Sequence, residues 1–88
     1  MEILSLNLHR RFFMQILDET KNIEYRARTD YWEKRLKAKK YTHIRFRNGY
    51  LKVAPEMLVE LKKIVAKADH FELHLGRISQ KKNTELLG

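Results

Sequence analysis

The stretch that decides the fold of this chain is Lys-Asn-Ile-Glu-Tyr-Arg-Ala-Arg, residues 21–28. From residue 23 onward, its odd-numbered positions carry apolar or aromatic side chains and its even-numbered positions carry charged ones. This period of two is typical of a half-buried β-strand, whose alternate side chains point to opposite faces of a sheet. We therefore expect the odd-numbered side chains, such as Tyr25, to face the core. The even-numbered ones, Glu24 and Arg26 among them, should form an exposed charged face, with Lys21 at the start of the strand.

The size and composition of the chain indicate one small folded domain with an anionic partner. It has 88 residues, with 19 Lys and Arg against 11 Asp and Glu, which gives a formal net charge of +8. A chain of this length buries only about 60% of the surface that it exposes when unfolded, so its core must be single and compact. The positive charge favours nucleic acid as the partner, with an acidic membrane surface as the weaker alternative. We place the domain at residues 1–80 and expect residues 81–88 to form a C-terminal tail.

The sequence argues against several kinds of site and location. The chain has no cysteine, which excludes disulfides, thiol nucleophiles and cysteine-based zinc sites. Its four histidines, at positions 9, 43, 70 and 74, do not have the spacing of metal ligands on one element. We therefore expect no metal and no cofactor. The chain also has no apolar run typical of a signal peptide or a membrane span, which predicts no membrane partner and a cytoplasmic location.

Two segments have the periodicity of short helices. Apolar residues recur at helical spacing over about residues 8–17, and Asn7 is placed to cap this helix. The second helix is expected over residues 30–37, with Thr29 or the residue after it as the N-cap. Arg10 falls in the first turn of the first helix, beside free backbone N–H groups. This arrangement suggests a site for a phosphate or a carboxylate.

Further strands are expected where polar and apolar residues alternate. One covers residues 1–6 and another covers residues 41–47, which place Arg45 and Arg47 on an outer face. Asn48-Gly49 follows directly as a strong turn signal. It leads either into a tight hairpin or into a wider loop.

The segment from Pro55 to Asp69 is ambiguous. Its apolar residues fit a helix well, and a subset of them also fits a strand, so periodicity favours a helix. A clear strand follows over residues 71–75. Gly76 after it suggests a bulge or a close approach of two backbones.

Taken together, four segments resemble the signature of the ASCH family in the PUA-like superfamily: Ile16–Arg26, Arg45–Tyr50, Ala54–Met57 and Phe71–Gly76. In that family a helix ends in a Gly-x-Lys turn and runs into a strand reading hydrophobic, Glu, any residue, Arg. The resemblance implies an α+β fold, a small PUA-like β-barrel of about five to six strands. Two helices would flank a cleft that binds RNA, nucleotides or modified nucleosides. It also implies a strand in the ambiguous segment, and we therefore expect one over residues 56–66, against the periodicity.

The resemblance assigns roles residue by residue. Lys21 matches a lysine that acts as the base in small amidohydrolases that deacetylate acetylated cytidine. Their threonine three residues later is Glu24 in this chain, and Glu24 and Arg26 match the commoner ASCH pattern. The family's glycine two residues before the lysine is Glu19 here. A Lys21–Glu24 ion pair makes a binding site, whereas an Arg26–Glu24 pair releases Lys21 to act as a base or to hold a phosphate.

The leading hypothesis is an RNA- or nucleoside-binding module with a basic cleft. In this hypothesis a base stacks on a tyrosine and the arginines hold phosphate. Its expected binding residues are Arg10, Lys21, Tyr25, Arg26, Arg45, Arg47 and Tyr50.

Two other hypotheses remain open. The second is a small hydrolase, either an amidohydrolase of acetylated cytidine or a ribonuclease. It would use Lys21 as the base and Glu24 as a further catalytic group, with Thr20 or Thr42 replacing the missing threonine. The third is an adaptor that binds an acidic protein. The sequence does not indicate an oligomeric state.

Overall fold

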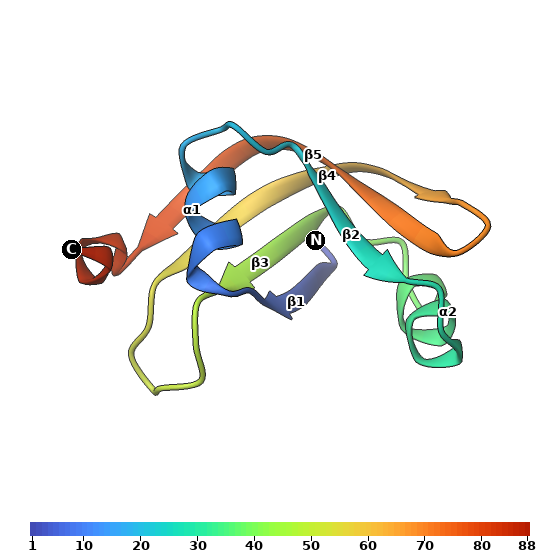
Figure 1. Ribbon diagram of the computed structural model, residues 1–88, viewed down its shortest axis with the longest axis horizontal. Helices are drawn as coiled ribbons and strands as arrows, with labels where there is room; N and C mark the ends of the chain where they lie inside the picture. Colours follow the sequence, from blue (N-terminus) through green and yellow to red (C-terminus); the bar gives the residue numbers. More distant parts are fainter.

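The computed structural model describes residues 1–88 and has an α+β fold, with two α-helices and a five-stranded mixed sheet that curls into a half-barrel (Figure 1). The elements in chain order are β1 (Ile3–Asn7), α1 (Arg10–Leu17), β2 (Ile23–Ala27), α2 (Asp30–Lys37), β3 (His43–Arg47), β4 (Glu56–Ala66), β5 (His70–Lys82) and a 3₁₀ helix (Thr84–Leu87). The α+β class expected from the sequence is confirmed.

The strands lie in the order β1-β3-β4-β5-β2. β1 pairs in parallel with β3, and all other neighbours are antiparallel. β1 and β2 are therefore the two edges of the sheet, although α1 connects them directly in the chain. The curl brings these edges toward each other, so that the Arg26 guanidinium on β2 donates a hydrogen bond to the Asn7 carbonyl on β1 over 3.4 Å.

One hydrophobic core fills the inside of the half-barrel. Phe46 on β3 and Phe71 on β5 are almost completely buried there. Phe13 on α1 and Leu36 on α2 pack into the same cluster. Both helices are thus held by burial of their apolar stripes, as short helices must be. No helix in the fold combines the length and the apolar content that crossing a membrane requires.

The helices differ in how their first turns are capped. α1 begins two residues later than its apolar pattern predicts, because Asn7 does not cap it. Asn7 ends β1 and bonds to Gly49 instead, and His9 is an N-cap without a side-chain hydrogen bond. α2 covers the predicted residues, and the Thr29 hydroxyl accepts a hydrogen bond from the Trp32 backbone N–H over 3.3 Å.

The ambiguous segment is a strand. β4 pairs with β3 and with β5, so the helix that periodicity favours is wrong and the strand over residues 56–66 is confirmed. Residues 57–59 are consecutive, apolar and buried, and such a run has no alternation to distinguish a strand from a helix. The pairing of β5 with β4 shifts register beside Gly76, where a Cβ would lie 3.1 Å from the Glu60 Cβ. The expected close approach is therefore present.

The Asn48-Gly49 signal begins a wide loop rather than a tight hairpin. The Asn48 backbone N–H donates to the Pro55 carbonyl over 3.0 Å, which closes the loop at its base. Gly49 has a φ of +104°, a backbone conformation that residues with a Cβ rarely adopt.

Residues 81–88 do not form a tail. β5 extends to Lys82, and the 3₁₀ helix that follows places Leu87 in the core with 7% of its surface exposed. The Leu87 carbonyl also accepts a hydrogen bond from the Arg10 guanidinium of α1. The polar run over residues 81–83 suggests a tail, but Leu87 beyond it returns to the core.

Candidate functional site

β2 presents its charged residues to the inside of the half-barrel, the reverse of the expected orientation. Glu24 pairs in register with the buried Leu73 and is only 5% exposed, whereas Tyr25 is 51% exposed. The prediction that the odd-numbered side chains of this strand feed the core is therefore wrong. It fails because the inner face of this edge strand borders a polar pocket, where a carboxylate can be buried if cations neutralise it.

Glu24 contacts two cations, one with each carboxylate oxygen. The Lys21 ammonium lies 3.1 Å from Oε1, and the Arg26 guanidinium lies 2.8 Å from Oε2. The two ion pairs that the sequence leaves as alternatives thus form together. Both cations are mostly covered, with side chains 18% and 20% exposed. We call Lys21, Glu24 and Arg26 the charged triad.

The turn that positions Lys21 is built without glycine. Glu19 adopts the left-handed conformation, with φ of +64°. The Thr20 and Lys21 backbone N–H groups both donate to the Gln15 carbonyl, over 3.0 and 3.1 Å. The Thr20 hydroxyl bonds to the Asp18 carboxylate over 2.7 Å, and this bond lowers the pKa of Asp18. Glu19 stands where the ASCH signature has glycine, in the conformation that glycine adopts most readily.

Replacing Glu19 with Gly is expected to raise the free energy of unfolding by about 0.5 to 1 kcal/mol, because it removes the strain of a left-handed residue that has a Cβ. Urea unfolding followed by circular dichroism measures the change. Glu19→Ala removes the charge but keeps the Cβ, and it should give no such gain. Equal stabilisation by both variants would contradict the backbone explanation.

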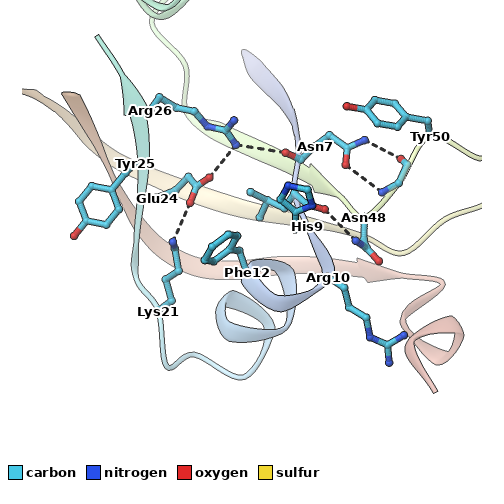
Figure 2. Close-up of a pocket in the computed structure, with 12 residues that line it drawn as sticks. Asn7, His9, Arg10, Phe12, Lys21, Glu24, Tyr25, Arg26, Asn48 and Tyr50 are labelled. Carbon is cyan, nitrogen blue, oxygen red and sulfur yellow. Dashed lines mark hydrogen bonds and ion pairs between the residues drawn. The ribbon is translucent and has the colours of Figure 1, made fainter. Parts of the chain in front are cut away.

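The charged triad forms one wall of a pocket with a volume of about 590 Å³ (Figure 2). The other walls come from the end of β1, the first turn of α1 and residues 48–50 after β3. We call it the triad pocket. It lies where the two edges of the half-barrel approach each other, so elements that are distant in the sheet order meet there.

Side-chain amides fasten the rim of the triad pocket. The Asn7 amide donates to the Gly49 carbonyl over 2.9 Å and accepts from the Gly49 N–H over 3.1 Å. The Asn48 amide donates to the Leu8 carbonyl over 3.0 Å. These bonds tie the loop after β3 to the end of β1, which gives this side of the pocket a defined shape (Figure 2).

Three aromatic side chains border the pocket. Phe12 is 37% exposed, Tyr25 51% and Tyr50 90%. The Lys21 ammonium lies 4.7 Å from the centre of the Phe12 ring and 5.5 Å from that of Tyr25, both within cation–π range. The Tyr25 ring projects away from Glu24 (Figure 2). Phe12 and Tyr50 are therefore better placed than Tyr25 to meet a ligand inside the pocket.

Arg26 links the pocket to α2. Its guanidinium carbon lies 5.1 Å from the centre of the Trp32 ring, and that of Arg35 lies 5.3 Å from the same ring. The Arg26 Nε is buried and has no hydrogen-bond partner. Stacking on Trp32 thus restricts where the guanidinium can lie, so α2 helps to orient a residue of the triad.

Five of the seven predicted binding residues line the triad pocket: Arg10, Lys21, Tyr25, Arg26 and Tyr50. The Arg10 side chain points away from Glu24 (Figure 2) and donates to the Leu87 carbonyl. One of its functions is therefore to attach the 3₁₀ helix to α1.

The remaining two, Arg45 and Arg47, lie on the outer face of β3 and do not line this pocket. Both contact the Glu56 carboxylate, at 3.8 Å and 3.2 Å. Arg47 also donates to the Leu51 and Lys52 carbonyls. Arg47 therefore holds the loop after β3 in place.

The triad pocket has no hydroxyl nucleophile of the threonine type. No Ser or Thr is among its lining residues. The Thr20 hydroxyl is bonded to Asp18, and the Thr42 hydroxyl donates to the Glu2 carbonyl over 3.3 Å. Lys21 contacts a carboxylate and two aromatic rings, and none of these groups is a nucleophile that it could activate. The arrangement is suited to binding.

A second group of titratable side chains lies on and next to β5. His70 Nδ1 lies 2.6 Å from the Asp69 carboxylate, and this contact raises the pKa of His70 and lowers that of Asp69. His74 Nε2 lies 3.0 Å from the Glu72 carboxylate and lowers the pKa of Glu72. None of the four lines the triad pocket, and no cluster of His, Asp and Glu in the structure is arranged to hold a metal ion.

Sequence reasoning misses half of the residues that line the pocket, and Asn7, Phe12 and Asn48 are the most informative of these. Phe12 belongs to the apolar stripe of α1, Asn48 to a turn signal, and Asn7 resembles a helix cap. Each therefore has a sufficient local explanation. No signal in a single sequence indicates that Asn7, at the end of β1, bonds to the loop after β3, or that Asn48 in that loop bonds back to Leu8.

No protein-family model matches this chain, and no curated protein matches it either. The interpretation of the site therefore rests on its geometry and on the motif resemblance described above.

Proposed function

We propose that this protein is an RNA- or nucleoside-binding domain of the ASCH type, with the triad pocket as its ligand site. The observation that carries the proposal is the nearly buried Glu24 carboxylate, held between Lys21 and Arg26 in the wall of a 590 Å³ pocket. This volume falls within the range of about 300 to 1,000 Å³ that is usual for small-molecule sites.

The charged triad is hard to explain by stability alone. Taking charges out of water costs several kcal/mol per ion, and apolar side chains of similar volume often give equal or greater stability. In a ligand site the same groups have a use. The Lys21 and Arg26 N–H groups donate to phosphate or carbonyl oxygens, and the Glu24 carboxylate accepts from the amino group of a base.

The aromatic rim supplies the other half of nucleobase recognition. Tyr50 is 90% exposed at the pocket edge, and Phe12 contributes a partly exposed ring. Stacking of one base on such a ring contributes about 1 to 3 kcal/mol and tolerates any base. The polar groups of the triad would then supply the selectivity.

The ASCH assignment, and with it a PUA-like barrel, has three structural supports. The sheet curls into a half-barrel, and Glu19, at the position of the signature glycine, has a positive φ that glycine adopts readily. The Lys21 and Arg26 side chains of the Lys-x-x-Glu-x-Arg motif both contact the Glu24 carboxylate. These three observations support the proposal.

The hydrolase hypothesis has weaker support, because the pocket offers no Ser or Thr for Lys21 to activate. We expect no deacetylation when the protein is incubated with acetylated cytidine, and no cleavage of a mixed RNA pool. Turnover that Lys21→Ala abolishes would overturn the binding-only proposal.

Lys21→Ala is expected to weaken binding of single-stranded RNA about tenfold or more, because a charge-assisted contact contributes about 1.5 to 3 kcal/mol. Fluorescence anisotropy with a labelled mixed-sequence RNA measures the dissociation constant. Binding by the unchanged protein should also weaken with rising salt, as phosphate contacts require. Arg26→Ala should act in the same direction.

Lys62→Ala is the matched control, because Lys62 is exposed on β4 and lines no pocket of the structure. Circular dichroism establishes whether each variant keeps its fold. If folded Lys21→Ala and Arg26→Ala bind RNA as tightly as the unchanged protein, the triad pocket is not the RNA site.

A further inference from the structure

A second groove adjoins the triad pocket on the outer face of the sheet. It is lined by residues of β3, β4 and β5, among them Arg45, Glu56 and Lys82, and has a volume of about 530 Å³. We call it the outer groove. A smaller hollow of about 230 Å³ contains Arg45 of the outer groove and also Asn7 and Tyr50 of the triad pocket. The hollow therefore lies between the triad pocket and the outer groove and shares lining residues with each.

The strand register makes this path continuous. Asn7 pairs with Arg47, Arg47 with Glu56, and Glu56 with Lys82, which forms one row across β1, β3, β4 and β5. Neighbouring strands lie about 4.8 Å apart, so the row is roughly 14 Å long. At about 3.4 Å per stacked nucleotide, that length accommodates roughly four nucleotides.

Positive charge predominates along the row. Arg45, Arg47, Lys81 and Lys82 border the outer groove or the hollow beside it, against Glu56 as the single carboxylate. Glu56 already contacts both arginines, at 3.8 and 3.2 Å. The Arg45 side chain is 42% exposed and both lysines are exposed, so these cations remain accessible to an anion.

Tyr50 lies at the junction of the triad pocket and the connecting hollow. It lines both the triad pocket and the connecting hollow and is 90% exposed. Its loop is anchored on one side by the Asn7 amide and on the other by the Arg47 guanidinium, which holds the Leu51 and Lys52 carbonyls. An exposed ring on an anchored loop between two basic depressions is what a stacking platform for successive bases requires.

We infer that the natural ligand is a single-stranded polynucleotide, with one nucleotide in the triad pocket and about three more along the row from the connecting hollow to the outer groove. This inference rests on the proposed function of the triad pocket. A free nucleoside would occupy the pocket alone and leave the charges of the outer groove unused. A polynucleotide brings one phosphate per nucleotide to the row of cations.

The test compares a nucleoside monophosphate with a single-stranded RNA hexamer, each titrated into the protein by calorimetry at low and at physiological salt. We expect the hexamer to bind at least tenfold more tightly. The double variant Arg45→Ala/Lys82→Ala should weaken hexamer binding about tenfold and leave monophosphate binding unchanged. Lys62→Ala/Lys63→Ala removes the same charge from exposed positions outside the groove and should change hexamer binding less than twofold.

Each other outcome counts against the inference in a distinguishable way. Equal affinity for both ligands overturns the inference but leaves the proposed function standing. Equal losses in the two double variants show that bulk charge acts rather than the groove. A hexaglutamate peptide that binds as tightly as the hexamer indicates a protein partner instead. If neither nucleotide ligand binds, the proposed function fails and the inference fails with it.

Discussion

Replacing Glu24 with Ala is expected to lower the free energy of unfolding by about 3 kcal/mol, because it leaves two mostly covered cations without their shared counterion. Lys21 and Arg26 lie 3.1 and 2.8 Å from the Glu24 carboxylate, and each has a side chain about one-fifth exposed. For a domain of this size the loss corresponds to a fall in Tm of roughly 15 °C. A thermal melt followed by circular dichroism measures it.

The triple variant Lys21→Met/Glu24→Met/Arg26→Met separates stability from function. Removing all three charges leaves no ion unpaired, so its stability should return to within about 1 kcal/mol of that of the unchanged protein. Its RNA binding should nevertheless be lost. A triple variant as unstable as Glu24→Ala would show that packing, and not charge balance, determines the cost at this position.

Phe46→Ala is expected to destabilise the protein by about 3 to 5 kcal/mol. The Phe46 side chain is completely buried on β3, an interior strand of the sheet, where Phe46 pairs with Leu6 on β1 and Met57 on β4. A protein of this length has a total stability of about 4 to 13 kcal/mol, so the variant will be partly unfolded if the total is near the lower limit. Urea unfolding at low temperature measures the remaining stability.

Tyr50→Ala is the control, because Tyr50 is also aromatic but is 90% exposed. Its removal should change stability by no more than about 0.5 kcal/mol. A Tyr50→Ala variant that loses as much stability as Phe46→Ala would mean that the loop after β3 packs against the core, contrary to the structure.

The sequence predicts the positions of the elements better than the direction of their faces. The two helices and the strands around residues 21–28 and 41–47 are present where periodicity places them. The β2 faces are reversed because hydrophobic alternation assumes that the inside of a sheet is apolar, and here the inside contains the charged triad. A single sequence does not reveal which strand of a sheet borders a pocket.

Periodicity also fails at residues 56–66, for the opposite reason. There the strand is buried on both faces near its start, so consecutive apolar residues replace the alternation and imitate a helical pattern. The motif resemblance predicts this strand because it depends on the order of several segments rather than on local spacing. The buried Leu87 was missed because a short polar run precedes it.

The site was predictable in its charged centre and not in its rim. Glu24 and Arg26 lie on β2 and Lys21 lies in the turn just before it, so their meeting follows from local geometry. Asn7 and Gly49 meet because β1 pairs in parallel with β3, a long-range contact that no local pattern encodes. Arg45 and Arg47 lie on the outer face of β3, as the local alternation of that strand predicts, and only their separation from the triad pocket was not predictable.

The strand order also sets when the first residues of the chain find their place during synthesis. β1 has β3 as its sole partner in the sheet, so Ile3–Asn7 remain unpaired until the ribosome has released the chain through Arg47. β2 waits longer, because it pairs with residues up to His74 of β5. The β1 edge can therefore pair before β4 and β5 are synthesised, whereas the β2 edge can pair only after β5 is available. A nascent chain thus acquires its complete ligand site only when it is nearly finished.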